Sequence, residues 1–373
     1  MLPSKCFPSG HSVKKCLVGG AVRDKLLGIP VAECDWVVLG ESPASMLKQG
    51  YRQVGKAFPV FLHPETGEEY ALARKEQKTG PGHQNFTFDT SPAVTLEEDL
   101  YRRDLTINAM AENADGTIFD PYGGQEDLRN RQLRHVSPAF EEDPLRVFRL
   151  ARFYAKFKSL GFEVDDQTRL LCKNMARRGD LQDLSSERIF MELDKAMKTQ
   201  HPENFFAFIM DIGAANQFWP DLTEAGITRL TLLPDDLDPA QKFAGLCWGL
   251  SETDLENMSS HVRLPKYWQE LNLLLARHSE RLINPDLASA PQIVSTLEHL
   301  DARRKPERFE KLLQLIQVIQ SNPSNGIEAK WKKWQALCAN AKTNTLSAHL
   351  TGPEIKAAIS ASLIKIIEDD LHG

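Results

Sequence analysis

The sequence predicts an α+β protein, with an N-terminal head built on a mixed β-sheet with helices and a long helical region after it. Before residue 138, short runs of β-branched and aromatic residues alternate with glycine and proline turns. From Pro144 onward, hydrophobic residues recur at helical spacing. No apolar run approaches the roughly 20 residues of a membrane-spanning helix, so we expect no membrane partner.

Length and composition narrow the class of protein. At roughly 100–200 residues per domain, 373 residues predict two or three domains. The 42% hydrophobic residues exclude a disordered chain, and the net charge of −6 excludes a histone-like basic protein but not a local basic face for nucleic acid. Six scattered cysteines without a C-x-x-C spacing argue against a zinc site or a disulfide framework. Without an apolar signal segment at the N-terminus, we expect a reducing, cytoplasmic location.

The expected elements follow in order along the chain. Strands are predicted at 14–18, 35–39, 60–63, 69–74 and 118–120, and a helix follows Gly19-Gly20 up to Leu27. The polar segment 75–84, which contains Gly80-Pro81-Gly82, is expected to be a mobile loop. Helical spacing is clearest at 145–157, 181–197, 271–275 and 312–319, and we expect only helices from Pro144 to the end.

The segment Leu17 to Asp24 joins a predicted strand to a helix through two glycines. Without side chains, Gly19 and Gly20 let a phosphate approach the backbone, and Arg23 offers a charged fork to the same group. A tight turn without a ligand is the alternative for the glycine pair alone.

Two carboxylates come at the start of the strand Asp35–Leu39. Residues i and i+2 of a strand point to the same side, so Glu33 and Asp35 would lie together. A divalent cation such as Mg²⁺ would relieve their repulsion, and two such ions assist phosphoryl transfer. A solvated acidic strand end is the alternative, but the pair soon after a Gly-Gly turn is more specific.

The run Arg102 to Met110 carries a mixed polar set. Asp104 and Asn108 share a face if the run is helical, with Arg103 nearby, and together they could hold a ribose and a phosphate. The alternative is that Asp104 only caps a helix.

A fourth motif starts at Glu142. Asp143 before Pro144 is typical of a helix start, with Asp as the N-cap. Arg146, Arg149 and Arg152 then recur every third residue, which suits contacts with phosphates and base edges, although a solvated face is equally compatible.

These four segments, in this order, resemble the class II tRNA nucleotidyltransferases, the CCA-adding enzymes of the polymerase-β-like superfamily, and are close to the gammaproteobacterial type. The resemblance is carried by 17–24, 102–109, 120–124 and 142–146 and covers nearly all of 14–210. It implies a catalytic head at 1–138, a helical neck with base recognition at 139–210, and a helical body and tail at 211–373 that binds tRNA. It also implies CTP and ATP as substrates, two Mg²⁺ ions and the tRNA 3′ end as partner.

The resemblance assigns roles to individual residues. It implies that Glu33, Asp35 and Glu69 hold metal, and that Gly19, Gly20 and Arg23 contact the nucleotide. Arg103, Asp104 and Asn108 match the ribose motif, Asp143 and Arg146 match the pair that reads the base, and Arg149 and Arg152 match further nucleotide contacts. Residues 75–91 match the loop used in switching from C to A addition, and 120–124 the hinge between head and neck.

Two departures from the family pattern matter. The metal pair is normally Asp-x-Asp, whereas the first member here is Glu33, whose extra methylene displaces the carboxylate. Relatives often carry an HD phosphohydrolase site, but the corresponding stretch 246–251 reads Leu-Cys-Trp-Gly-Leu-Ser and lacks both ligands. We therefore expect no HD-type activity.

The helical remainder offers basic groups for tRNA, namely Arg303, Arg304 and Lys305, and Lys332 and Lys333 between tryptophans. Amphipathic core helices with solvated lysines would show the same pattern of basic residues. Three functions stay open at this point: CCA addition; addition of only CC, only A or poly(A); and an RNA-binding paralogue impaired by Glu33.

Overall fold

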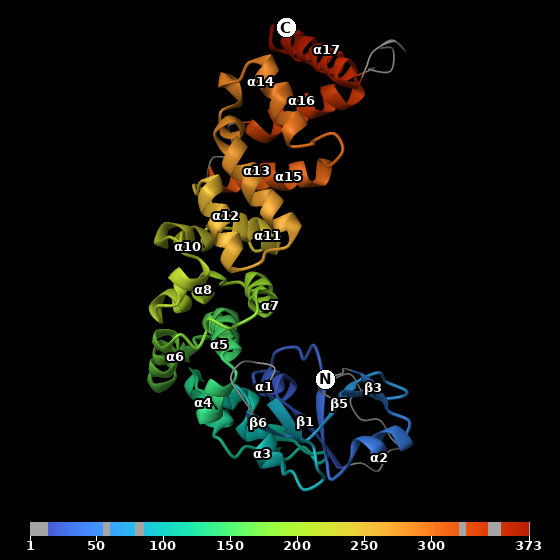
Figure 1. The fold of residues 1–373 in the computed structure, drawn as a ribbon, viewed down its shortest axis with the longest axis vertical. Helices are drawn as coiled ribbons and strands as arrows, with labels where there is room; N and C mark the ends of the chain where they lie inside the picture. The colour runs from blue at the N-terminus through green and yellow to red at the C-terminus, as the bar shows by residue number, and fades with distance from the viewer. Residues whose placement is uncertain (1–13, 55–59, 79–85, 321–325, 342–351, 373) are drawn as a thin grey trace. The chain divides into compact units, whose positions relative to one another are not determined.

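The computed structural model describes residues 14–54, 60–78, 86–320, 326–341 and 352–372 (Figure 1). They form two compact units. Unit 1 runs to Ala196 and includes Asn204–Ala215, and unit 2 consists of Met197–Glu203 and the chain from Asn216 onward. The residues of the expected head, 1–138, fall in unit 1, and so do those of the expected neck, 139–210, apart from 197–203. Among the described helices, none has the length and apolar character needed to cross a membrane.

A seven-stranded mixed sheet forms the base of unit 1, as predicted. Its strand order is β3-β4-β5-β2-β1-β8-β9. The pair β2–β5 is parallel and the other neighbours are antiparallel. The strands are β1 (Lys14–Val18), β2 (Asp35–Leu39), β3 (Arg52–Val54), β4 (Val60–Leu62), β5 (Glu69–Leu72), β8 (Ala111–Glu112) and β9 (Ile118–Phe119).

Alternation along β2 gives the sheet two buried faces. Trp36 and Val38 pack with Met46 of α2 (Pro43–Lys48) on one face. Val37 packs on the other face with Leu100 of α3 (Leu96–Tyr101). The core therefore fixes the start of β2, which carries Asp35, relative to its neighbours β1 and β5.

Two expectations about secondary structure were wrong. Part of the expected loop 75–84 is a strand, because β6 (Lys75–Lys78) pairs antiparallel with β7 (Phe86–Asp89). The Phe-Thr-Phe run of β7 favours a strand and supplies the partner that the polar segment alone does not reveal. Residues 79–85 of that loop lie outside the described chain. The region after Pro144 is also not purely helical, since β11 (Glu163–Val164) pairs with β10 (Gln132–Leu133).

Helices complete unit 1. The helix α5 begins at Leu145 with Pro144 at the N-cap, one residue later than predicted, while the Asp143 carboxylate still accepts a bond from the Leu145 N–H at 3.2 Å. Phe148 and Tyr154 of α5 pack against Phe205 and Phe208 of α8. The helices are α1 (Gly20–Leu26), α4 (Gly124–Asn130), α5 (Leu145–Phe157), α6 (Asp166–Arg178), α7 (Ser186–Met197) and α8 (Glu203–Asp211), with 3₁₀ turns at Thr106–Asn108, Pro138–Glu142 and Lys158–Leu160.

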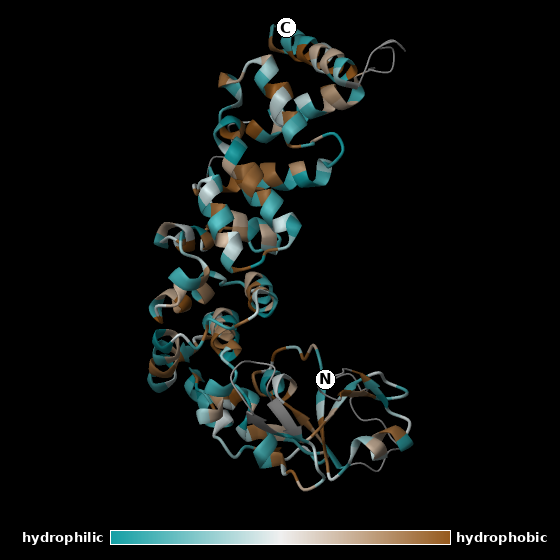
Figure 2. Cartoon of the chain, in the orientation of Figure 1, coloured by the Kyte–Doolittle hydropathy of each residue, from teal (hydrophilic) through white to brown (hydrophobic). Residues whose placement is uncertain are grey.

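The described part of unit 2 is helical, as predicted. Hydrophobic segments of α13 and α15 stand out in Figure 2, and these two helices are in contact. The Trp331 indole N–H donates to the Leu282 carbonyl at 3.0 Å and ties α16 to α13. The helices are α9 (Ala215–Phe218), α10 (Glu224–Leu230), α11 (Pro239–Leu246), α12 (Glu252–His261), α13 (Lys266–Ile283), α14 (Ala290–His299), α15 (Pro306–Ile319), α16 (Ile327–Asn340) and α17 (Gly352–His372), with a 3₁₀ turn at Pro285–Leu287.

Candidate active site

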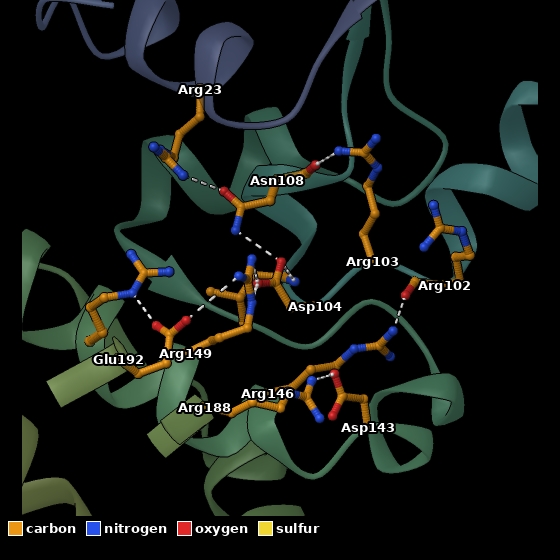
Figure 3. Close-up of polar contacts among 12 residues, drawn as sticks. Arg23, Arg102, Arg103, Asp104, Asn108, Asp143, Arg146, Arg149, Arg188 and Glu192 are labelled. Atoms are coloured by element: carbon orange, nitrogen blue, oxygen red, sulfur yellow. Dashed lines mark hydrogen bonds and ion pairs between the residues drawn. The ribbon is translucent and has the colours of Figure 1, made fainter. Parts of the chain in front are cut away.

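A cleft of about 590 Å³ lies within unit 1 and is bounded by the β1–α1 turn, the starts of β2 and β5, residues 99–108, and α5. Every head and neck residue singled out from the sequence as a site residue lines this cleft. Nine basic and six acidic side chains line it. The basic side chains suit an anionic ligand, and the acidic ones suit cations that accompany it. Figure 3 shows the polar contacts among its central residues.

Gly19 adopts a backbone conformation that disfavours any side chain. Its φ of +71° is in the left-handed region, and a Cβ placed on it would lie 2.8 Å from Nη1 of Arg103. The positive φ is the main reason that glycine stands there, because the tip of the flexible Arg103 side chain could move aside for a Cβ. A glycine turn also leaves the cleft open beside the backbone, as expected for phosphate binding.

Three carboxylates come together at one edge of the sheet. The parallel register of β2 and β5 places Asp35 opposite Glu69, and Glu33 lies two residues before Asp35 in the segment that leads into β2. Desolvation by the cleft raises the pKa of Asp35, nearby Arg103 opposes this shift, and Glu33 adds to it.

This edge has the chemistry of a magnesium site. Carboxylate oxygens are the ligands that Mg²⁺ prefers, and a cation would stabilise the charged form of Asp35, which desolvation and, to a smaller extent, Glu33 disfavour. Within the described chain, no three His, Cys, Asp or Glu side chains are already arranged around a common metal position. The chemistry of the three carboxylates fits Mg²⁺, but their present arrangement is not closed around a metal position.

Asp104 is the hub of the polar network in Figure 3. Its Oδ1 accepts bonds from the Leu105 N–H at 2.8 Å and from Asn108 Nδ2 at 3.0 Å. Its Oδ2 accepts from Arg149 Nε at 2.8 Å and Nη2 at 2.7 Å. Burial alone would raise the pKa of Asp104, but Arg149 and these donors hold it well below the usual range. Asp104 is therefore a fixed anion at any physiological pH.

Arg23 and Asn108 extend the hub toward the glycine turn. Arg23 is only 4% exposed and donates to the Asn108 amide oxygen and, at 2.7 Å, to the carboxylate of Asp24. Its guanidinium also lies over the Phe153 and Phe157 rings, with centroids at 5.2 and 4.9 Å. Arg23 thus orients Asn108 from within the protein.

The predicted base-reading pair is held from two sides. The Asp143 carboxylate accepts from Arg188 Nη2 of α7 at 2.9 Å, in addition to the Leu145 N–H. Arg146 is buried and donates to the backbone carbonyls of Ala139 and Arg102. The side chains of both residues are therefore positioned before any base arrives.

Arg149 and Arg152 share a partner that the sequence analysis missed. Glu192 of α7 accepts from Arg152 and lies 3.9 Å from Arg149, and its side chain is only 5% exposed. The Arg152 guanidinium lies over the Phe153 ring, 4.0 Å from its centroid. The two arginines stay on one side of α5 because Glu192 and the ring hold them there.

Further cleft residues were also missed. Arg74, Asp99, Arg102, Phe153, Lys156 and Arg188 line the cleft, and Glu192 lies behind it. One local pattern could have revealed part of this set, because Asp99 stands three residues before Arg102 and four before Arg103, the spacing at which side chains pair on a helix. The Nε of Arg103 is buried without a hydrogen-bond partner among the described residues.

The residues proposed for tRNA contact lie outside this cleft, in unit 2, and four of the five form ion pairs with acids. Arg303 is exposed on the turn before α15. The ion pairs are Arg304–Asp301 at 2.7 Å, Lys305–Glu270 at 3.7 Å, Lys332–Glu310 at 2.8 Å and Lys333–Asp370 at 2.6 Å. An RNA phosphate would compete with these carboxylates.

Comparison with known proteins gives consistent similarities. Residues 15–134 match the family described as the poly A polymerase head domain, and residues 161–225 match the probable RNA and SrmB-binding site of polymerase A. A multifunctional CCA protein of Pseudomonas putida KT2440 is 43% identical over 368 residues, 95% of this chain and 99% of its own length. A CCA-adding enzyme of Pseudomonas putida F1 is 47% identical over 79% of this chain and 81% of its own length. The Bacillus stearothermophilus CCA-adding enzyme in complex with CTP shares the fold, with a TM-score of 0.74 and 24% identity over 96% of this chain and 90% of that one.

Proposed function

The chain belongs to the class II CCA-adding tRNA nucleotidyltransferases, and we propose that its cleft adds C, C and A in turn to the 3′ end of tRNA. CTP and ATP are the substrates, and pyrophosphate leaves at each step. The observation that carries this proposal is the meeting of carboxylates, the Asp104 hub and the Asp143–Arg146 pair in one cleft.

In the proposed reaction, the 3′-hydroxyl of the tRNA attacks the α-phosphate of the bound nucleotide. A new P–O bond forms, the bond from the α-phosphate to the leaving pyrophosphate breaks, and the proton of the hydroxyl is released to solvent. Glu33, Asp35 and Glu69 would hold Mg²⁺, which when bound activates the hydroxyl and neutralises the leaving group. Arg103 and Lys156 line the cleft and would offer donors to the phosphates, with Lys156 exchanging its 3.5 Å ion pair with Asp24 for a phosphate oxygen.

Base selection needs no nucleic-acid template in this scheme. An aspartate accepts and an arginine donates along a base edge, so Asp143 and Arg146 together imitate a pairing partner. C and A both present an exocyclic amine beside an unprotonated ring nitrogen, whereas G and U present a carbonyl and a ring N–H. Each unmatched polar group costs about 1–3 kcal/mol, or roughly 5- to 150-fold in binding.

The remaining assignments extend the same proposal. Asp104 and Asn108 contact the ribose, and the three-part division at 138 and 210 separates head, neck, and body with tail. Residues 246–251 at the end of α11 provide neither ligand of an HD site, so purified protein should not release phosphate from a 2′,3′-cyclic nucleotide. The five described cysteines are free thiols, which supports a cytoplasmic location.

The test is incorporation of labelled CTP and ATP, with Mg²⁺, into tRNA that lacks its CCA end, resolved to single nucleotides. Growth by C, C and A that then stops is the expected result, and Asp35→Asn should abolish it while the exposed control Asp183→Asn should not. A halt after CC, addition of A alone, or a long A ladder would replace the proposal by a narrower activity. Binding of tRNA without extension would identify the chain as an impaired paralogue, with Glu33 as the first cause to examine.

A further inference from the structure

The carboxylate of Asp99 joins three parts of the cleft wall. It is 1% exposed, and its Oδ1 accepts from Arg102 Nη2 at 3.0 Å and from the Arg74 N–H at 3.2 Å. Its Oδ2 accepts from Arg103 Nη2 at 3.2 Å. Burial alone would raise the pKa of Asp99, but the two arginines hold it below the usual value, so the carboxylate stays charged.

The Arg102 side chain binds the backbone of Arg74, the residue whose N–H donates to Asp99. Its Nε donates to the Arg74 carbonyl at 3.2 Å, so Asp99 and Arg102 together bind both the N–H and the C=O of Arg74. Arg74 lines the cleft and lies between β5, which carries Glu69, and the β6–β7 pair. The two side chains therefore set the position of this junction.

The backbone of Arg102 also contacts the predicted base reader. The guanidinium of Arg146 donates to the Arg102 carbonyl (Figure 3). It also donates to the Ala139 carbonyl. A shift of residue 102 would thus move the acceptor that orients Arg146. One connected set of hydrogen bonds runs from the β5–β6 junction through Asp99 and Arg102 to Arg146.

We propose that Asp99 and Arg102 are positioning residues that set the choice between C and A, by fixing the Arg146 guanidinium relative to the β5–β6 junction. The proposal rests on the proposed function of the cleft and adds to it a determinant of specificity. Neither residue needs to touch the base. Their effect reaches the nucleotide through the Arg102 carbonyl and the backbone of Arg74.

The choice of nucleotide is sensitive to this arrangement for a geometric reason. The amine and ring nitrogen of a purine lie differently from those of a pyrimidine relative to the sugar, so one guanidinium must be aimed differently for each. Loss of one or two hydrogen bonds in the set changes the aim but leaves the carboxylates at Asp35 and Glu69 in place. Discrimination should therefore suffer more than transfer.

The experiment measures kcat/KM for CTP and for ATP on three acceptors, namely tRNA lacking CCA, tRNA ending in C and tRNA ending in CC. The main variant is Arg102→Lys, which keeps a charge near Asp99 but lacks the fork that reaches Arg74 at the same time. We expect the preference for ATP over CTP at the CC end to fall about tenfold, the equivalent of one hydrogen bond to a charged group. The first C addition should change by less than about threefold, and Arg129→Ala at the exposed end of α4 should match the wild type.

Several outcomes decide the matter. A fall of equal size for both nucleotides on all acceptors, or an unchanged ratio, would overturn the proposal. Asp99→Asn keeps an acceptor for Arg74 but removes the charge between two arginines, and it should shift the ratio in the same direction. If a variant is poorly folded, the binding of unreactive CTP and ATP analogues still reports the preference between them. General instability lowers the amount of both analogues bound by the same factor and leaves their ratio unchanged. A wild type that fails to extend any tRNA would refute the proposed function itself and is visible before any variant is compared.

Discussion

Replacing Asp104 by asparagine tests the hub of the site most directly. All four atoms that contact the carboxylate are donors, at 2.7 to 3.0 Å, on Leu105, Asn108 and Arg149. An asparagine amide has a single acceptor oxygen, so in either orientation its NH₂ group faces two donors. The nearly isosteric change therefore removes two bonds and leaves the Arg149 guanidinium with only the more distant Glu192 carboxylate at 3.9 Å.

The expected cost follows from the burial of the pair. Removing one partner of a buried ion pair costs about 3–5 kcal/mol. The Arg149 side chain is 36% exposed, which allows partial screening, so we expect a loss at the lower end, about 3 kcal/mol. The assay is hydrogen exchange in urea, followed in peptides that cover 99–110 and α5, with exposed Asp183→Asn as the control.

The pH dependence of the free energy of unfolding tests whether Asp104 stabilises the fold as an anion. A carboxylate whose pKa is lowered on folding contributes stability that is complete above its unfolded pKa of about 3.9 and is lost below it. The difference between wild type and Asp104→Asn should therefore be constant from about pH 5 to 8 and narrow below about pH 4. A loss under about 1 kcal/mol, or a difference that does not narrow in acid, would refute the account of Asp104 as a fixed anion.

Three further predictions follow from other residues. Glu33→Asp should raise the rate of nucleotide addition at saturating Mg²⁺, because the shorter side chain restores the usual metal pair. An unchanged rate in single-turnover assays would show that Glu33 already serves as a metal ligand. Arg188→Ala removes the 2.9 Å bond that orients Asp143, so misincorporation of G or U should rise about fivefold in single-nucleotide assays, with Arg188→Lys intermediate and an unchanged error rate as the contrary result. Burial, aided by neighbouring His299, lowers the pKa of His278 to about 4, so the unfolding free energy of unit 2 should fall by about 2–3 kcal/mol as the pH drops from 7 to 4. His278→Phe should flatten this profile, and an equally steep one would show that other groups cause the loss.

Local signals made the catalytic half of the site predictable. The β-branched run after Asp35 predicts β2 with its observed bounds, and the two glycines predict the turn that Gly19 makes at positive φ. Glu69 joins Asp35 only through the parallel register of β2 and β5, which no local pattern specifies. That placement came from the family resemblance.

The supporting residues were missed because their partners lie far along the chain. Arg188 is 45 residues from Asp143, and Glu192 is 40 residues from Arg152. The same cause limits the tRNA assignment, since the Lys333 ammonium pairs with Asp370 of another helix. A run of basic letters cannot show whether acids of other elements already neutralise it.

The order of the chain through the two units limits how the protein can be divided. Unit 1 resumes at Asn204 after Met197–Glu203 has passed into unit 2, and α8 then returns Phe205 and Phe208 to the aromatic side chains of α5. A fragment that stops at Ala196 would leave those rings without their partners, whereas one that continues to Ala215 keeps them. Chimaeras that exchange the C-terminal half between homologous enzymes should therefore join after residue 215. Residues 197–203 belong to unit 2, so they should come from the same parent as the C-terminal half.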